Sequence, residues 1–183
     1  MANAAELRDW LAANHTRTES VWLVTYKKHV ADRYVSYDDI VDEVLCFGWI
    51  DSLPRRLDAD RTMLRLSPRQ RGSAWSGINK ARVARLVVAG RMQPAGLAKV
   101  EEAKQGGSWT FLDDVEAMIE PEDLVEVLAR HPGARENFDA FPKSYRRGVL
   151  EWIKLAKRPQ TRAKRIDETA RLASENRKAL QPG

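Results

Sequence analysis

The stretch Leu45-Cys46-Phe47-Gly48-Trp49-Ile50-Asp51-Ser52 decides the fold of this chain. A helical pattern of apolar residues ends at Gly48, and a short strand-like run begins immediately after it. Glycine is typical of the position that follows a helix, because it adopts positive φ without a steric penalty. The stretch therefore predicts a helix that turns directly into a strand.

The residues before Gly48 predict two helices and a strand. Apolar residues at helical spacing indicate a helix over 37–46, and Ser36 is placed to cap it. Residues 20–27 are β-branched and aromatic, which favours a strand, and residues 4–14 carry one apolar helical face. The stripe of the central helix comprises Ile40, Val41, Val44 and Leu45.

The residues after Gly48 predict a β-hairpin. A strand over 49–53 places Trp49, Asp51 and Leu53 on one face by the two-residue period of β-structure. Residues 58–61 are turn formers, and the chain returns as a strand over 62–66. Together with the preceding helices, this hairpin predicts a small α+β unit.

Helical patterns occupy the rest of the chain. Ser76 is placed to cap a helix that runs to Ala89. We expect further helices over 95–105, 121–129, 134–141, 145–157 and 161–178. The run Gly106-Gly107-Ser108 is the best linker. The predicted fold class is thus α+β, with a small sheet and helices in residues 1–106. A basic, all-helical region follows over 107–183, which we expect to pack on the first.

Composition indicates a folded protein. The chain has 183 residues, 43% of them apolar, with six Trp and one Cys. The lone cysteine excludes an intramolecular disulfide framework. We expect a cytoplasmic protein, because no export signal and no apolar run of membrane-spanning length is visible.

Arginine density points to an anion site near the hairpin. Residues 49–95 hold 10 Lys or Arg against 3 Asp or Glu. Arginine pairs bidentately with carboxylate and phosphate, and the helix that begins at Ser76 offers a positive N-terminus. A solvated face of a hairpin is the alternative. The candidate ligand-binding residues are Trp49, Asp51, Ser52, Arg55, Arg69, Ser73, Trp75 and Asn79.

Several of these side chains also have a purely structural interpretation. Trp49 and Trp75 either stack a ring or fill the core. Asp51 is either a general base or the partner of an arginine. Cys46 is better explained as a buried residue than as a nucleophile, because the C-terminus of a helix disfavours a thiolate. The three histidines have no metal-ligand spacing, so we expect no metal and no cofactor.

The C-terminal region offers a second candidate binding surface. Residues 96–142 hold 4 basic and 11 acidic side chains, whereas residues 143–183 hold 12 and 4. The basic helices either bind a nucleic acid or pack on the acidic segment 101–139. Nucleic acid is the less favoured partner. The residues that would contact it are Arg158, Arg162, Lys164 and Arg165.

Five separated motifs resemble the YdeI/OmpD-associated family, also called bacteriocin-protection proteins. They span Cys46–Ser52, Ser67–Arg69, Ser73–Lys80, Gly90–Gly96 and Trp152–Ile166. The resemblance implies a role in tolerance of stress such as cationic antimicrobial peptides, and any outer-membrane link is expected to be indirect. It supplies no accepted catalytic residues, so whether the chain is an enzyme stays open.

Three functional hypotheses follow. The first is an accessory stress-tolerance protein with a small-anion or nucleotide pocket. The second is a nucleic-acid-binding protein that uses the basic C-terminal helices. The third is a scaffold that meets another protein through its charged faces.

Overall fold

The computed structural model describes residues 1 and 3–179, and the chain divides into two compact units. The N-terminal unit spans Met1–Phe111 and the C-terminal unit starts at Leu112. The N-terminal unit combines helices with an antiparallel sheet, whereas the described part of the C-terminal unit is helical. The predicted α+β class is confirmed. The predicted packing of the second region on the first stays a prediction.

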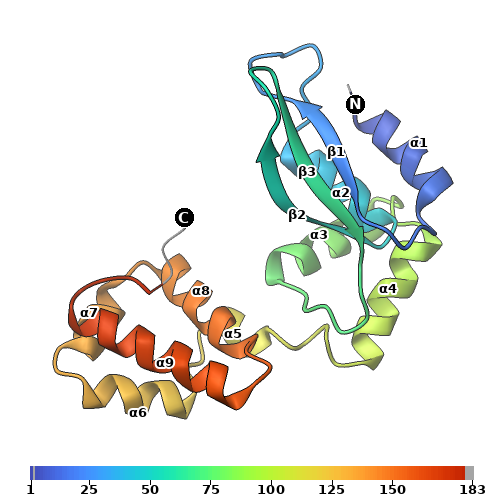
Figure 1. Ribbon diagram of the computed structural model, residues 1–183. Helices are drawn as coiled ribbons and strands as arrows, with labels where there is room; N and C mark the ends of the chain where they lie inside the picture. Colours follow the sequence, from blue (N-terminus) through green and yellow to red (C-terminus); the bar gives the residue numbers. More distant parts are fainter. Residues whose placement is uncertain (2, 180–183) are drawn as a thin grey trace. The chain divides into compact units, whose positions relative to one another are not determined.

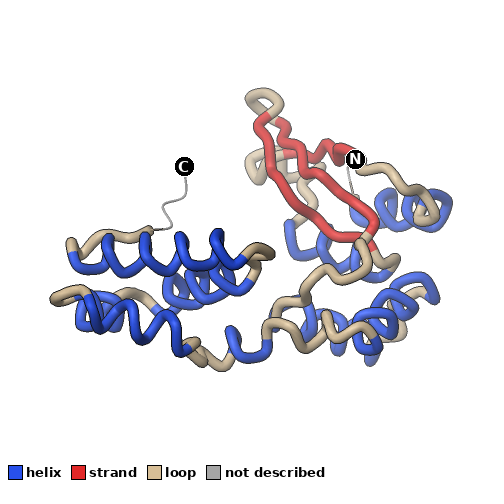
Figure 2. Tube along the Cα trace, turned by 60° about the horizontal axis from the view of Figure 1, so that its bottom comes forward, coloured by secondary structure: helices blue, strands red, loops and turns tan. Residues whose placement is uncertain are grey.

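A three-stranded sheet organises the N-terminal unit, in the order β1-β3-β2 with both pairings antiparallel. Its elements are α1 (Ala4–Asn14), β1 (Val21–Tyr26), α2 (Tyr37–Cys46), β2 (Trp49–Arg56), β3 (Arg61–Pro68), α3 (Gly77–Val88) and α4 (Pro94–Gln105). Figures 1 and 2 show α1 and α2 against one face of the sheet, and among the described residues of this unit no helix crosses the other face.

Local capping explains why these helices begin and end where the sequence predicts. The Ser36 hydroxyl accepts a hydrogen bond from the Asp39 N–H at 3.1 Å. Ser76 does the same for the Asn79 N–H at 3.4 Å. Gly48 has φ +76°, the left-handed conformation expected after α2. The helix-to-strand turn is confirmed.

The sheet separates a buried face from an exposed one. Leu23, Thr25, Leu64 and Leu66 are buried beneath the helices. Trp22 lies opposite Arg65 in the β1–β3 register, and both side chains are exposed. The β2–β3 register shifts between Asp51 and Pro54, which marks a bulge. The two-residue alternation predicted for β2 therefore does not hold beyond Asp51, and Leu53 is exposed.

The start of α4 is joined to the end of α2. The Gln93 N–H donates to the Cys46 carbonyl at 3.0 Å. Gly96 lies directly against this turn, where an added Cβ would approach the Cys46 carbonyl far closer than the 3.0 Å that real side chains respect. The absence of a side chain at Gly96 thus lets two segments distant in sequence touch through their backbones.

The C-terminal unit is a helical bundle in which α9 packs against α6, α7 and α8. Its helices are α5 (Asp113–Glu116), α6 (Glu122–Arg130), α7 (Ala134–Ala140), α8 (Lys143–Lys154) and α9 (Pro159–Ser174). The short α5 is absent from the sequence prediction. The last helix also ends at Ser174 rather than Lys178, because Asn176 adopts φ +53° and the Arg177 N–H returns to the Leu172 carbonyl.

Candidate functional site

A small cavity lies beside Arg69, directly after β3. The Arg69 N–H donates to the Gly48 carbonyl at 3.0 Å, so the turn after α2 fixes the backbone from which this side chain projects. The walls come from the loop after β3, from α4 and from the turn that follows α4. Polar and charged groups that line the cavity include those of Arg69, Arg71, Ser73, Lys99, Glu102 and Ser108.

The Arg69 guanidinium is buried without a counterion. The residue is 2% exposed, and its Nη2 donates to the Ala74 carbonyl at 2.6 Å. Its Nε and Nη1 have no hydrogen-bond partner among residues 1 and 3–179. Burial lowers the pKa of Arg69 to about 10, while the charge of Asp51 opposes that shift. Arg69 therefore keeps its positive charge at neutral pH and has donors to spare.

Two tryptophans complete the surroundings of Arg69. Its guanidinium carbon lies 3.6 Å from the centre of the Trp75 ring, and Trp75 is 1% exposed. The Trp109 ring lies 5.0 Å from that of Trp75, and the amino groups of Lys80 and Lys104 lie within 6 Å of the Trp109 ring. The cation–π contact offsets part of the cost of burying the charge, but it supplies no hydrogen-bond acceptor.

The charges at the rim favour a negative ligand. Lys99 donates to Glu102 at 2.8 Å, and this contact, aided by Arg71, lowers the pKa of Glu102 below its usual range. Three cationic side chains thus face one carboxylate around the cavity. The enclosed space is about 10 Å³, which suits a single water-sized group. The arrangement can bind one atom of an anion.

Three of the predicted ligand residues meet at this cavity. Arg69, Ser73 and Trp75 line it together. Asp51 lies close enough to Arg69 to act on its pKa, but its carboxylate accepts from the Tyr37 hydroxyl at 2.7 Å. The Asn79 N–H donates to the Ser76 hydroxyl, which caps α3.

The other three predicted residues lie elsewhere. Trp49 is buried in the core, where its Nε1 donates to the His15 carbonyl at 3.0 Å and its ring meets that of Trp10 edge-on. Ser52 is exposed on β2. Arg55 is exposed too, with its guanidinium 4.9 Å from the centre of the Trp22 ring. The eight predicted residues therefore do not form one pocket.

Sequence reasoning missed Lys99 and Ser108 as cavity residues. Both follow Arg69 by thirty residues or more, on α4 and in the turn after it. Gly106 and Gly107 signalled a turn at this point, and Gly107 does adopt φ +75°. These glycines indicate where the chain turns, but they do not indicate which residues the turn contacts.

A second group of buried charges lies on α2 and was also missed. Asp42 and Glu43 are each 4% exposed. Asp42 accepts from Arg82 at 3.0 Å and from Arg85 at 2.8 Å. Glu43 accepts from Arg8 at 2.8 Å and from Arg91 at 2.6 Å. These six residues, here called the α2 ion network, leave both carboxylates fully paired, as expected for a structural cluster.

Two of the four basic residues proposed for nucleic-acid binding are engaged within the C-terminal unit. Arg162 donates to both carboxylate oxygens of Asp123, at 2.7 and 2.8 Å. Arg165 donates to the Trp152 carbonyl and lies over the Trp152 ring. Arg158 and Lys164 are exposed. This surface stays a prediction, with fewer available cations than the sequence indicated.

The described residues contain neither a metal-type cluster nor a membrane-spanning helix. No three His, Cys, Asp or Glu side chains among residues 1 and 3–179 are grouped to hold a metal ion. Within the same range, every helix is too short or too polar to cross a bilayer. Cys46 is buried, and burial raises the pKa of its thiol, which opposes nucleophilic chemistry there.

Comparison with known proteins gives two family matches. Residues 1–99, more than half of the chain, match a family described as Domain of unknown function (DUF8412). Residues 117–176 match the family described as Bacteriocin-protection, YdeI or OmpD-Associated, which confirms the resemblance over that region. The four motifs between Cys46 and Gly96 fall inside the first match. No curated protein and no solved structure matches the chain.

Proposed function

Because the chain belongs to the family described as Domain of unknown function (DUF8412), whose name states no activity, we propose its function from the Arg69 cavity and the second family match. The protein is an accessory factor of bacterial tolerance to bacteriocins or antimicrobial peptides. It acts in the cytoplasm and binds a small anion at Arg69.

The observation that carries this proposal is the unpaired state of Arg69. A buried cation without a counterion is costly, and buried polar groups that lack partners are rare in folded proteins. Arg69 has two nitrogens without partners, while every buried carboxylate of the α2 ion network is paired. An anion beside Nε or Nη1 supplies the missing acceptor and balances the charge.

The size of the cavity narrows the class of ligand. About 10 Å³ admits one atom the size of a water oxygen. That atom is a halide or one oxygen of a carboxylate, nitrate or phosphate, whose remaining atoms extend past the rim toward Arg71 and Lys99. Ser73 and Ser108 supply hydroxyls that can donate to the same group. A whole nucleotide does not fit inside, so only one oxygen of its phosphate could enter.

The role in tolerance rests on the match over residues 117–176. In this proposal the N-terminal unit detects an anion whose level changes under stress. The C-terminal unit then carries the response typical of the bacteriocin-protection family.

Thermal unfolding of the full chain in different sodium salts, all at one ionic strength, tests the anion site. Chloride, nitrate, acetate and phosphate are compared for wild type and for Arg69→Met. A ligand that binds only the folded state increases the free energy of unfolding, by about 2.7 kcal/mol at a concentration of 100 times Kd, and Tm rises as a result. We expect at least one of these anions to raise Tm of the wild type but not of Arg69→Met.

Arg130→Met is the matched control. Arg130 is exposed on α6 and pairs only with Glu126 one helical turn away, so its loss leaves the cavity intact. It should keep the wild-type response to each anion. Equal behaviour of all four salts on wild type and on Arg69→Met would rule the site out, since only non-specific salt effects would then remain.

A further inference from the structure

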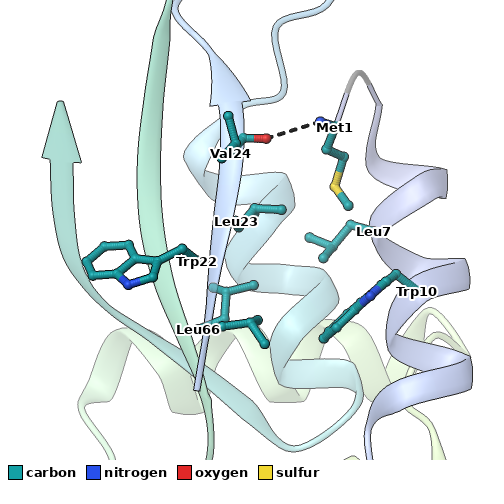
Figure 3. Close-up of a pocket in the computed structure, with 8 residues that line it drawn as sticks. Met1, Leu7, Trp10, Trp22, Leu23, Val24 and Leu66 are labelled. Carbon is teal, nitrogen blue, oxygen red and sulfur yellow. Dashed lines mark hydrogen bonds between the residues drawn. The ribbon is translucent and has the colours of Figure 1, made fainter. Parts of the chain in front are cut away.

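The outer face of the sheet, on the side away from α1 and α2, has a distinct composition. Figure 3 shows Trp22 directed away from α1, whereas Leu23 points toward Leu7 of that helix. The antiparallel registers place Trp22, Val24 and Tyr26 of β1 on the same face as Met63 and Arg65 of β3 and Arg55 of β2. Aromatic and cationic side chains thus share a surface that no helix of this unit covers.

Trp22 is the centre of this surface. It is 39% exposed, which is high for the largest side chain in proteins. The Arg55 guanidinium lies 4.9 Å from the centre of its ring. Arg65, directly across the register, donates to the Ser20 hydroxyl at 3.1 Å. A flat aromatic ring and two arginines therefore lie together in contact with water.

These two arginines carry uncompensated charge. Arg61 at the far end of β3 is paired with Asp58 at 2.7 Å. In contrast, no carboxylate of residues 1 and 3–179 lies within ion-pair distance of Arg55 or Arg65. A solvated ion-pair face, the usual role of charged strand residues, would alternate charges of both signs. Here the two charged residues placed beside the Trp22 ring are both positive.

We propose that this outer face binds single-stranded nucleic acid. Every base has a π-face that stacks on tryptophan or on an arginine plane, and phosphates pair with the same guanidinium groups. A base stacks on the Trp22–Arg55 pair, and Arg65 contacts the adjoining phosphate. The flat, open sheet suits a single strand, whose bases are accessible. A duplex hides its base faces and offers phosphates alone. The site is separate from the Arg69 cavity and does not depend on it.

Fluorescence anisotropy of the full chain with labelled oligo(dT) and oligo(U) of about 12 nucleotides tests this proposal. We expect binding to both, tighter at about 50 mM than at about 200 mM salt. Trp22→Ala should weaken binding about 10-fold or more, the effect of losing one stacked base. Trp22→Phe retains a π-face and should recover most of the affinity. Arg55→Gln and Arg65→Gln should each weaken binding and reduce its salt dependence.

Two controls distinguish this surface from other polyanion sites. The double variant Arg158→Ala, Lys164→Ala removes the exposed cations of the C-terminal alternative and should bind as wild type does. Polyglutamate and a duplex of the same length should compete poorly, because neither presents free bases. The proposal is overturned if neither oligonucleotide binds at low salt, if polyglutamate competes equally, or if Trp22→Ala binds unchanged. Loss of binding only in the double variant would overturn it in favour of the C-terminal helices.

Discussion

The α2 ion network and Arg69 both place buried charge in the N-terminal unit, but they differ in whether that charge is paired. Asp42 and Glu43 each accept from two arginines, which offsets the cost of their burial. Arg69 is more deeply buried and has one backbone acceptor. Paired charges hold helices together, whereas an unpaired buried charge needs an explanation, and for Arg69 we propose an anion. The contrast separates a structural cluster from the proposed binding site.

We expect the largest loss of stability when a paired charge is removed. Asp42→Asn leaves Arg82 and Arg85 without their shared carboxylate. We expect a loss of about 3 kcal/mol in the free energy of unfolding, the lower part of the range for breaking a buried ion pair, because Arg85 can turn to water. Chemical denaturation measures this loss. Asp38→Asn is the matched control: Asp38 is exposed on the same helix, so its loss should cost less than about 1 kcal/mol.

Removing the unpaired charge of Arg69 should not lower the free energy of unfolding, in contrast to Asp42→Asn. Arg69→Met keeps the volume and the contact with Trp75 but removes a cation that has no counterion. In a buffer of low anion content, we expect a stability that is unchanged or about 1 kcal/mol higher. Chemical denaturation in that buffer is the measurement. A loss comparable to that of Asp42→Asn would show that Arg69 stabilises the fold like a network member.

The smallest expected effect concerns Asp51, the carboxylate whose charge acts on Arg69. Its carboxylate accepts from Tyr37, and burial together with this hydrogen bond raises the pKa of Tyr37 to about 12. The folded state therefore holds this proton more tightly than the unfolded state. Its contribution to stability is present below about pH 10 and is lost as the pH rises toward about 12.

Absorbance titration of the phenolate detects this tyrosine among the four of the chain. We expect one late ionisation in the wild type, absent in Tyr37→Phe and shifted to lower pH in Asp51→Asn. No change in Asp51→Asn would show that the Asp51 carboxylate does not raise the pKa of Tyr37, which would contradict the role given to this hydrogen bond.

Local signals explain what the sequence predicted well. Ser36, Gly48 and Ser76 act on backbone groups within four residues of themselves, so their roles can be recognised in a linear reading. The same applies to Arg69 and Trp75, which are close in the chain and meet at the cavity. Fold class and the centre of the candidate site were therefore predictable.

Long-range pairing explains what the sequence did not predict. The partners of Glu43 lie 35 and 48 residues away, and nothing near Glu43 indicates that it is buried. Lys99 and Ser108 reach the cavity only because α4 docks on α2. The bulge in β2 likewise depends on pairing with β3, and it places Arg55 opposite Met63. Tertiary contacts, rather than local preference, decided each of these cases.

The C-terminal end of α2 also provides a probe of local opening. Cys46 is the single thiol of the chain, and it is fully buried there with a raised pKa. A thiol reagent can reach it only when the packing around the end of α2 opens, so the labelling rate in native buffer measures how often the N-terminal unit opens. Because residues 112–183 contain no cysteine, this labelling rate reports on the N-terminal unit alone, with no substitution or truncation of the chain.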